Sequence, residues 1–83
     1  MSKVLTERVL KVLVGVAPDI DPTAVAIDVN LRDQFDFDSM DTLHFAVGLK
    51  RELGVDIPDT EFRELASIGR CVKYLQKRLG PSA

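Results

Sequence analysis

Apolar residues recur at the spacing of an α-helix along most of this 83-residue chain, and no segment keeps the alternation of a strand. In the first such segment, Leu5, Leu13 and the apolar residues between them return at helical intervals on one face. This pattern predicts a first helix over about Lys3 to Val14, with Gly15 and Pro18 as its stop.

Three further helices are predicted downstream. The second runs over Met40 to Leu53, and Gly54 behind it suits a left-handed C-terminal cap. A short third helix begins near Asp59, and a fourth begins after Ser67, whose hydroxyl caps it. We therefore expect an all-α fold. It is a small four-helix bundle of three longer helices plus a short third helix, with a long loop between helices one and two.

The long loop extends from Ala17 to Asp38 and carries no sustained periodicity. Asp21 followed by Pro22 predicts one capped helical turn within it. We expect Leu31 and Phe35 to hold the loop against the core. An ordered connection of this length is often functional.

Size and charge limit the classes of function that the chain can have. Residues 1–83 are expected to form one free-standing domain, with 46% hydrophobic residues available for a small core. The formal net charge of −2 and the lack of a basic cluster argue against a nucleic-acid partner. No apolar run approaches the ~20 residues that span a bilayer. With one cysteine and no secretory signal, we expect a cytoplasmic monomer.

The predicted second helix has two apolar faces, although a helix on a small bundle needs only one. Phe45, Leu49 and Leu53 form a stripe wide enough to be the core face. Exposed apolar residues in one row often mark a partner site, although isolated ones are ordinary. The residues on the opposite side, which we interpret as a docking surface, are Met40, Leu43, Val47, His44 and Arg51.

Ser39 lies at the start of this second helix, within the stretch FDFDSMD. Its hydroxyl could cap the helix, and so could the carboxylate of Asp38 beside it. A helix N-terminus also favours a phosphate group, so a phosphoester on Ser39 would be tolerated there. The periodicity alone leaves capping and modification both open.

Independent catalysis and metal binding are not expected. Counted from Asp36, the spacing of ligands required for a calcium-binding loop fails. One histidine, His44, and one cysteine, Cys71, are too few for a metal cluster. We interpret His44 as a surface residue and Cys71 as a buried, inert thiol. We therefore expect that the protein is not an enzyme.

The stretch Asp38-Ser39-Met40-Asp41 resembles the D-S-L/M-D attachment motif of the acyl carrier protein family, whose members are phosphopantetheine-binding carriers. The run ELGVDIP, residues 52–58, is similar to the turn that follows the second helix in that family. The order of helices also matches, so the resemblance covers almost the whole chain. It favours modification of Ser39 over simple capping.

The resemblance implies that a phosphopantetheinyl transferase places 4′-phosphopantetheine from coenzyme A on Ser39. The arm's thiol then holds an acyl group as a thioester and presents it to partner enzymes in fatty acid, polyketide or related metabolism. By analogy, Asp38 and Asp41 help to position the transferase. The apolar part of the docking surface would comprise Met40, Leu43 and Val47.

The charge of the second helix departs from the family pattern, which is typically acidic. Lys50 and Arg51 offset Asp41 and Glu52, and His44 stands where an acid is common. Because rim charges largely set encounter rate and selectivity, we hypothesise a specialised carrier. It would serve a dedicated acyl-loading ligase, ketosynthase or acyltransferase.

A second departure is Asp36, which stands where the family usually has glycine two residues before the Asp-Ser pair. Aspartate tolerates a left-handed backbone better than most residues, so the turn is expected to survive. Two alternatives stay open. A peptidyl or aminoacyl carrier is the nearest, although Phe37 and Asp41 favour an acyl carrier. The other is a helical adaptor that docks through the second helix and is never modified on Ser39.

Overall fold

The computed structural model describes residues 3–80, so the ends of the predicted domain, residues 1–2 and 81–83, lie outside the described part. Those described residues are helical or irregular, with no strand, which confirms the all-α prediction. The elements in chain order are α1 (Lys3–Val16), η1 (Pro22–Ala24), α2 (Leu31–Gln34), α3 (Ser39–Leu53), η2 (Asp59–Leu65) and α4 (Ile68–Leu79).

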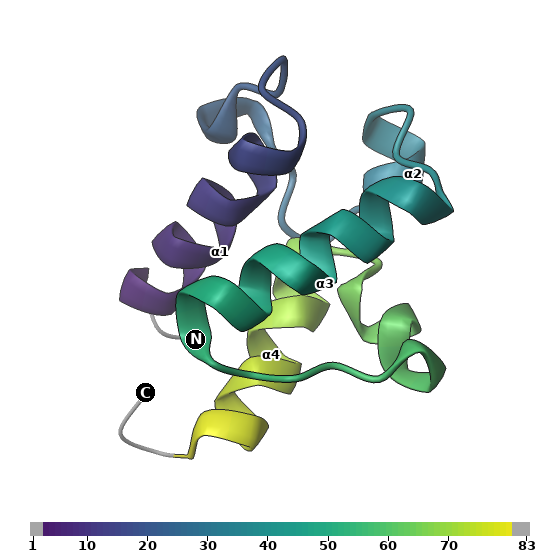
Figure 1. Cartoon of the computed structure of the whole chain (residues 1–83). Helices are drawn as coiled ribbons and strands as arrows, with labels where there is room; N and C mark the ends of the chain where they lie inside the picture. The colour runs from purple at the N-terminus through teal and green to yellow at the C-terminus, as the bar shows by residue number, and fades with distance from the viewer. Residues whose placement is uncertain (1–2, 81–83) are drawn as a thin grey trace.

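The three longer helices and η2 form the bundle (Figure 1). α1 packs against both α3 and α4, and η2 packs against the same two helices. Figure 1 shows α1 and η2 on opposite sides of α3. The core between them consists of fully buried apolar side chains. Its largest members include Leu13, Phe45, Leu49, Leu65, Ile68 and Leu75.

The boundaries of the two first long helices differ slightly from those predicted. α1 continues to Val16, because Gly15 keeps a helical backbone and only Pro18 prevents further extension. α3 begins at Ser39 rather than Met40, because Asp38 is the capping residue. Gly54 ends α3 in the left-handed conformation, with φ of 72°, as predicted.

The connection between α1 and α3 contains more structure than the sequence indicated. Asp21 caps η1 as predicted, accepting a hydrogen bond from the Thr23 N–H at 2.9 Å. The one-turn helix α2 was not predicted, because a single turn is too short to show periodicity. The side-chain amide of Gln34 in α2 exchanges two hydrogen bonds of 2.7 Å with the backbone of Ala26. This side chain replaces a backbone partner and holds the connection in a fixed shape.

Apolar anchors hold the connection to the bundle. Leu31 is 1% exposed, and its N–H donates to the Ala66 carbonyl at 2.8 Å. Phe35 is partly buried against the core, so both predicted anchors are confirmed. The predicted short third helix is η2, a 3-10 helix, and the predicted cap of α4 by Ser67 is also confirmed.

Candidate functional site

The N-terminus of α3 is closed by a reciprocal pair of aspartates. The N–H of Asp41 donates to Asp38 Oδ1 at 2.9 Å, and the N–H of Asp38 donates to Asp41 Oδ2 at 3.1 Å. This arrangement is a capping box, which satisfies two donors that a helix otherwise leaves without partners. Asp38 is therefore the capping residue of α3, and Ser39 is its first helical residue.

Ser39 is exposed to solvent, and its hydroxyl makes no hydrogen bond to any residue between 3 and 80. The suggestion that Ser39 caps the helix is therefore wrong, because Asp38 already does so. A serine oxygen without a structural role can react without loss of a stabilising contact. The side chain also lies at the positive end of the helix dipole, where a phosphate group is favoured.

The carboxyl of Asp38 stays ionised at neutral pH. Its pKa lies below the ordinary value of 3.8, mainly because the Asp41 N–H donates a hydrogen bond to the carboxylate. Hydrogen bonding to a charged form favours that form. Ser39 thus follows an ionised carboxylate that is held in place by the helix backbone.

The segment before the capping box is fixed by an aromatic pair. Phe37 is 4% exposed, and its ring meets that of Phe45 edge to face, with centroids 6.0 Å apart and planes at 89°. The N–H of Phe37 donates to the carbonyl of Phe35 at 2.8 Å, which closes a tight turn centred on Asp36. Phe37 is an anchor that helical periodicity does not predict, although an aromatic residue just before a helix cap is a usable signal.

Asp36 does not use the left-handed backbone that we considered for it. Among residues 3–80, only glycines have positive φ. The turn at Asp36 therefore forms with ordinary backbone angles, and the glycine of the family pattern is not needed here. The departure at this position leaves the attachment loop intact.

A row of apolar side chains runs along the outer face of α3 from Ser39. Met40 is 56% exposed, Leu43 40% and Val47 45%, whereas Phe45 and Leu49 on the other face are fully buried. The predicted separation into a core face and an exposed face is therefore confirmed. His44 and Arg51 are also exposed, as predicted.

The charges of α3 are partly engaged within the protein. The Lys50 ammonium lies 3.9 Å from the Asp56 carboxylate. Arg8 of α1 lies 3.5 Å from the carboxylate of Glu52 and donates to its carbonyl at 3.0 Å. Arg51 has no ion pair within the described residues. Arg51 is therefore the cation of α3 without an ion pair, and Lys50, whose side chain is 62% exposed in a long pair with Asp56, stays accessible as well.

A groove of about 570 Å³ opens beside Ser39, between α2, α3 and η2. Its apolar wall is formed by Phe37, Phe62 and Leu65. Arg32 and Arg63 supply positive charge on the same groove. The Asp38 carboxylate also lines this groove, so the exposed hydroxyl of Ser39 lies beside a surface that combines apolar side chains with charges of both signs.

Other reactive groups are scarce in the part of the chain that the structure describes. Residues 3–80 contain no group of three metal-binding side chains. Cys71 is buried, as predicted, and burial raises the pKa of its thiol to about 12. A thiol of this kind is unreactive at neutral pH. Over the same residues, no helix is long and apolar enough to cross a membrane.

Comparison with known proteins identifies close parallels. The model of the family described as "Phosphopantetheine attachment site" matches residues 7–75. A protein named "Acyl carrier protein" from Phenylobacterium zucineum (strain HLK1) is 34% identical over 80 residues, covering 96% of this chain and 99% of that protein. One of the same name from Campylobacter curvus (strain 525.92) is 34% identical over 58 residues, covering 70% of this chain and 75% of that protein.

Proposed function

Because the chain belongs to the acyl carrier protein family, whose members are carriers with a covalent 4′-phosphopantetheine group rather than enzymes, we propose that Ser39 is its attachment point. The observation that carries this proposal is the free, exposed hydroxyl of Ser39, beside a helix cap that does not need it. The arm supplies a terminal thiol on which an acyl group is held as a thioester.

Attachment would be a phosphoryl-type transfer from coenzyme A, carried out by a phosphopantetheinyl transferase. The Ser39 oxygen forms an ester bond to the phosphorus that carries the pantetheine arm. The phosphoanhydride bond of coenzyme A breaks, adenosine 3′,5′-bisphosphate leaves, and the hydroxyl proton passes to a base of the transferase. In this chain, the capping box keeps the backbone around Ser39 fixed during the transfer.

Intact-mass measurement of the apo protein, incubated with coenzyme A and a transferase of broad specificity, tests the proposal. We expect wild type to gain one phosphopantetheine and Ser39→Ala to gain none, because alanine lacks the oxygen to which the arm would be attached. The fold should be unaffected, because the Ser39 hydroxyl makes no hydrogen bond among residues 3–80. Thr42→Ala is the control in the same groove, because it removes a hydroxyl that donates to the Asp38 carbonyl at 3.1 Å and is not the proposed attachment point. It should load as wild type does.

Two results would contradict the proposal. If Ser39→Ala still gains the group, the attachment point lies elsewhere. If wild type gains nothing with several transferases while its helical spectrum is intact, the chain is an unmodified adaptor that docks through α3. The relatives found by comparison are named acyl carriers, which supports acyl rather than aminoacyl cargo.

We extend the proposal to the partners. The residues we propose for recognition lie in the capping box or along α3, and they are Asp38, Met40, Asp41, Leu43, His44, Val47, Lys50 and Arg51. The exposed apolar row and the free Arg51 support a dedicated ligase, ketosynthase or acyltransferase as partner over the enzymes of general fatty acid synthesis.

A competition assay with a housekeeping ketosynthase tests this choice of partner. We also propose the cytoplasmic setting that the sequence leads us to expect.

A further inference from the structure

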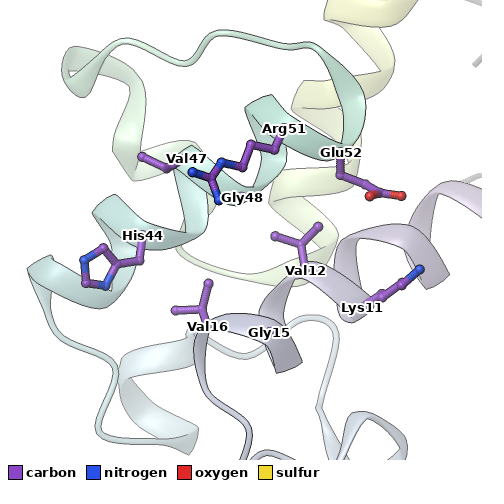
Figure 2. A pocket seen from close by; sticks show the side chains of 9 residues that line it. All are labelled: Lys11, Val12, Gly15, Val16, His44, Val47, Gly48, Arg51 and Glu52. Atoms are coloured by element: carbon purple, nitrogen blue, oxygen red, sulfur yellow. The ribbon is translucent and has the colours of Figure 1, made fainter.

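A second groove, of about 520 Å³, runs between α1 and α3 on the side of α3 that carries Val47 (Figure 2). Figure 2 shows Val12 and Val16 of α1 pointing toward α3, with Gly48 opposite them. The floor of this groove is therefore apolar. Val47 belongs both to this groove and to the exposed row on α3, so the two surfaces are continuous.

Gly48 lets α1 and α3 approach closely along this groove. A Cβ placed on Gly48 would lie 2.7 Å from Cγ1 of Val12, which is closer than real side chains approach. A side chain at this position would force Val12 or one of the helices to shift. Val12 and Val16 are only partly buried beside this contact, and both line the groove.

The walls of the groove carry unpaired positive charge. Lys11 on α1 and Arg51 on α3 both line it, and neither has an ion pair among residues 3–80. The one carboxylate in the lining, Glu52, is paired with Arg8. His44 lies in the lining too and contributes no negative charge. The groove is cationic although the chain has a net charge of −2.

We propose that this groove binds an acidic amphipathic segment of a partner protein, with its apolar side chains on the valine floor and its carboxylates against Lys11 and Arg51. The proposal rests on the proposed function, since a partner that reaches Ser39 along α3 meets this groove next. Complementary charge across a polar rim steers encounter and suppresses wrong partners. The free cations of Lys11 and Arg51 favour carboxylates on the partner segment over ammonium or guanidinium groups.

The test uses two synthetic helical peptides with the same apolar residues, one with glutamates and the other with lysines on the polar face. Each is titrated into the ¹⁵N-labelled full chain, and the amide shifts of Gly15 and Gly48 are followed by NMR. We expect the glutamate peptide to shift both glycines and to bind at least about fivefold more tightly than the lysine peptide. The preference should weaken as salt is added.

Charge reversal gives the matched comparison. Lys11→Glu, Arg51→Glu should reverse the preference between the peptides, whereas Lys73→Glu, Lys77→Glu changes the net charge equally on α4 and should leave it intact. Equal binding of the two peptides, shifts away from the groove, or the same effect from both double variants would overturn the proposal. Shifts at Gly15 and Gly48 that depend on protein concentration without peptide would also overturn it, since they indicate a second copy. Loading of Ser39 is measured separately by mass, so failure of either proposal is recognised without the other.

Discussion

Gly48 is the residue at which packing between α1 and α3 is most open to test. We expect Gly48→Ala to destabilise the protein by about 1 kcal/mol, because the strain of overpacking exceeds the gain in helix propensity. The added methyl would lie 2.7 Å from Cγ1 of Val12, whose branched side chain has few alternative rotamers in a helix. Urea denaturation of both proteins measures the difference in free energy of unfolding.

Gly15 provides the control for this substitution. It is also helical, and an added Cβ would meet no atom within 4 Å. Gly15→Ala should therefore stabilise the protein, by at most about 1 kcal/mol, through helix propensity alone. If both alanine variants change stability in the same direction and by the same amount, the close approach at Gly48 does not determine the packing of the two helices.

The sequence pattern identified Ser39 as a candidate site but could not assign the hydrogen bonding of its hydroxyl. Asp38 and Ser39 are adjacent and both are good capping residues, so composition cannot decide between them. The decision comes from Asp41, whose carboxylate accepts a hydrogen bond from the Asp38 N–H and thereby fixes the position of the cap. The free hydroxyl of Ser39 is a consequence of that pairing.

Among the helices, α3 should depend most directly on a single carboxylate, that of its capping residue Asp38. The depressed pKa of Asp38 means that its contribution is fully present above the ordinary pKa of 3.8 and is lost as pH falls through the lower folded value. We expect Asp38→Ala to lower the Tm by a few degrees at about pH 7. The difference from wild type should narrow as the pH falls below about 3.8.

Asp38→Asn separates the charge from the cap. Asparagine caps a helix about as well as aspartate but does not titrate. Its Tm at about pH 7 should lie nearer wild type than that of Asp38→Ala. The difference in Tm between these two variants should change little as the pH falls, because neither has a titrating side chain at position 38. A gap between wild type and Asp38→Ala that stays constant from about pH 7 to about pH 2.5 would contradict the assignment of the cap.

Among the elements, the long amphipathic helices were predictable and the short ones only in part. Periodicity over three or more turns located α1, α3 and α4, and the Asp21-Pro22 pair located η1. The helix α2 escaped prediction because its shape depends on Gln34, whose amide bonds to Ala26 eight residues earlier. A side chain that satisfies distant backbone groups leaves no local pattern in the sequence.

Over the whole molecule, the charge that a partner meets differs from what the sequence of α3 suggests. By composition, α3 is near neutral. In the folded chain, Glu52 is paired with Arg8, which lies 44 residues earlier in the sequence. Lys11 of α1 adds a cation to the same groove as Arg51. These two arrangements make the surface that a partner meets more cationic than α3 alone. No local sequence pattern predicts them, because they join residues far apart in the chain.

This charge distribution predicts that a housekeeping ketosynthase with a basic docking surface uses the holo protein poorly as a substrate. In a competition assay for elongation, we expect the holo form of Lys50→Glu, Arg51→Glu to be used several-fold better than holo wild type, because rim charges govern encounter and selectivity. Lys73→Glu, Lys77→Glu carries the same net charge change on α4 and should behave as wild type, which separates local from overall charge. If wild type already competes as well as an acidic housekeeping carrier, the chain is not specialised and the cations of α3 do not select its partners.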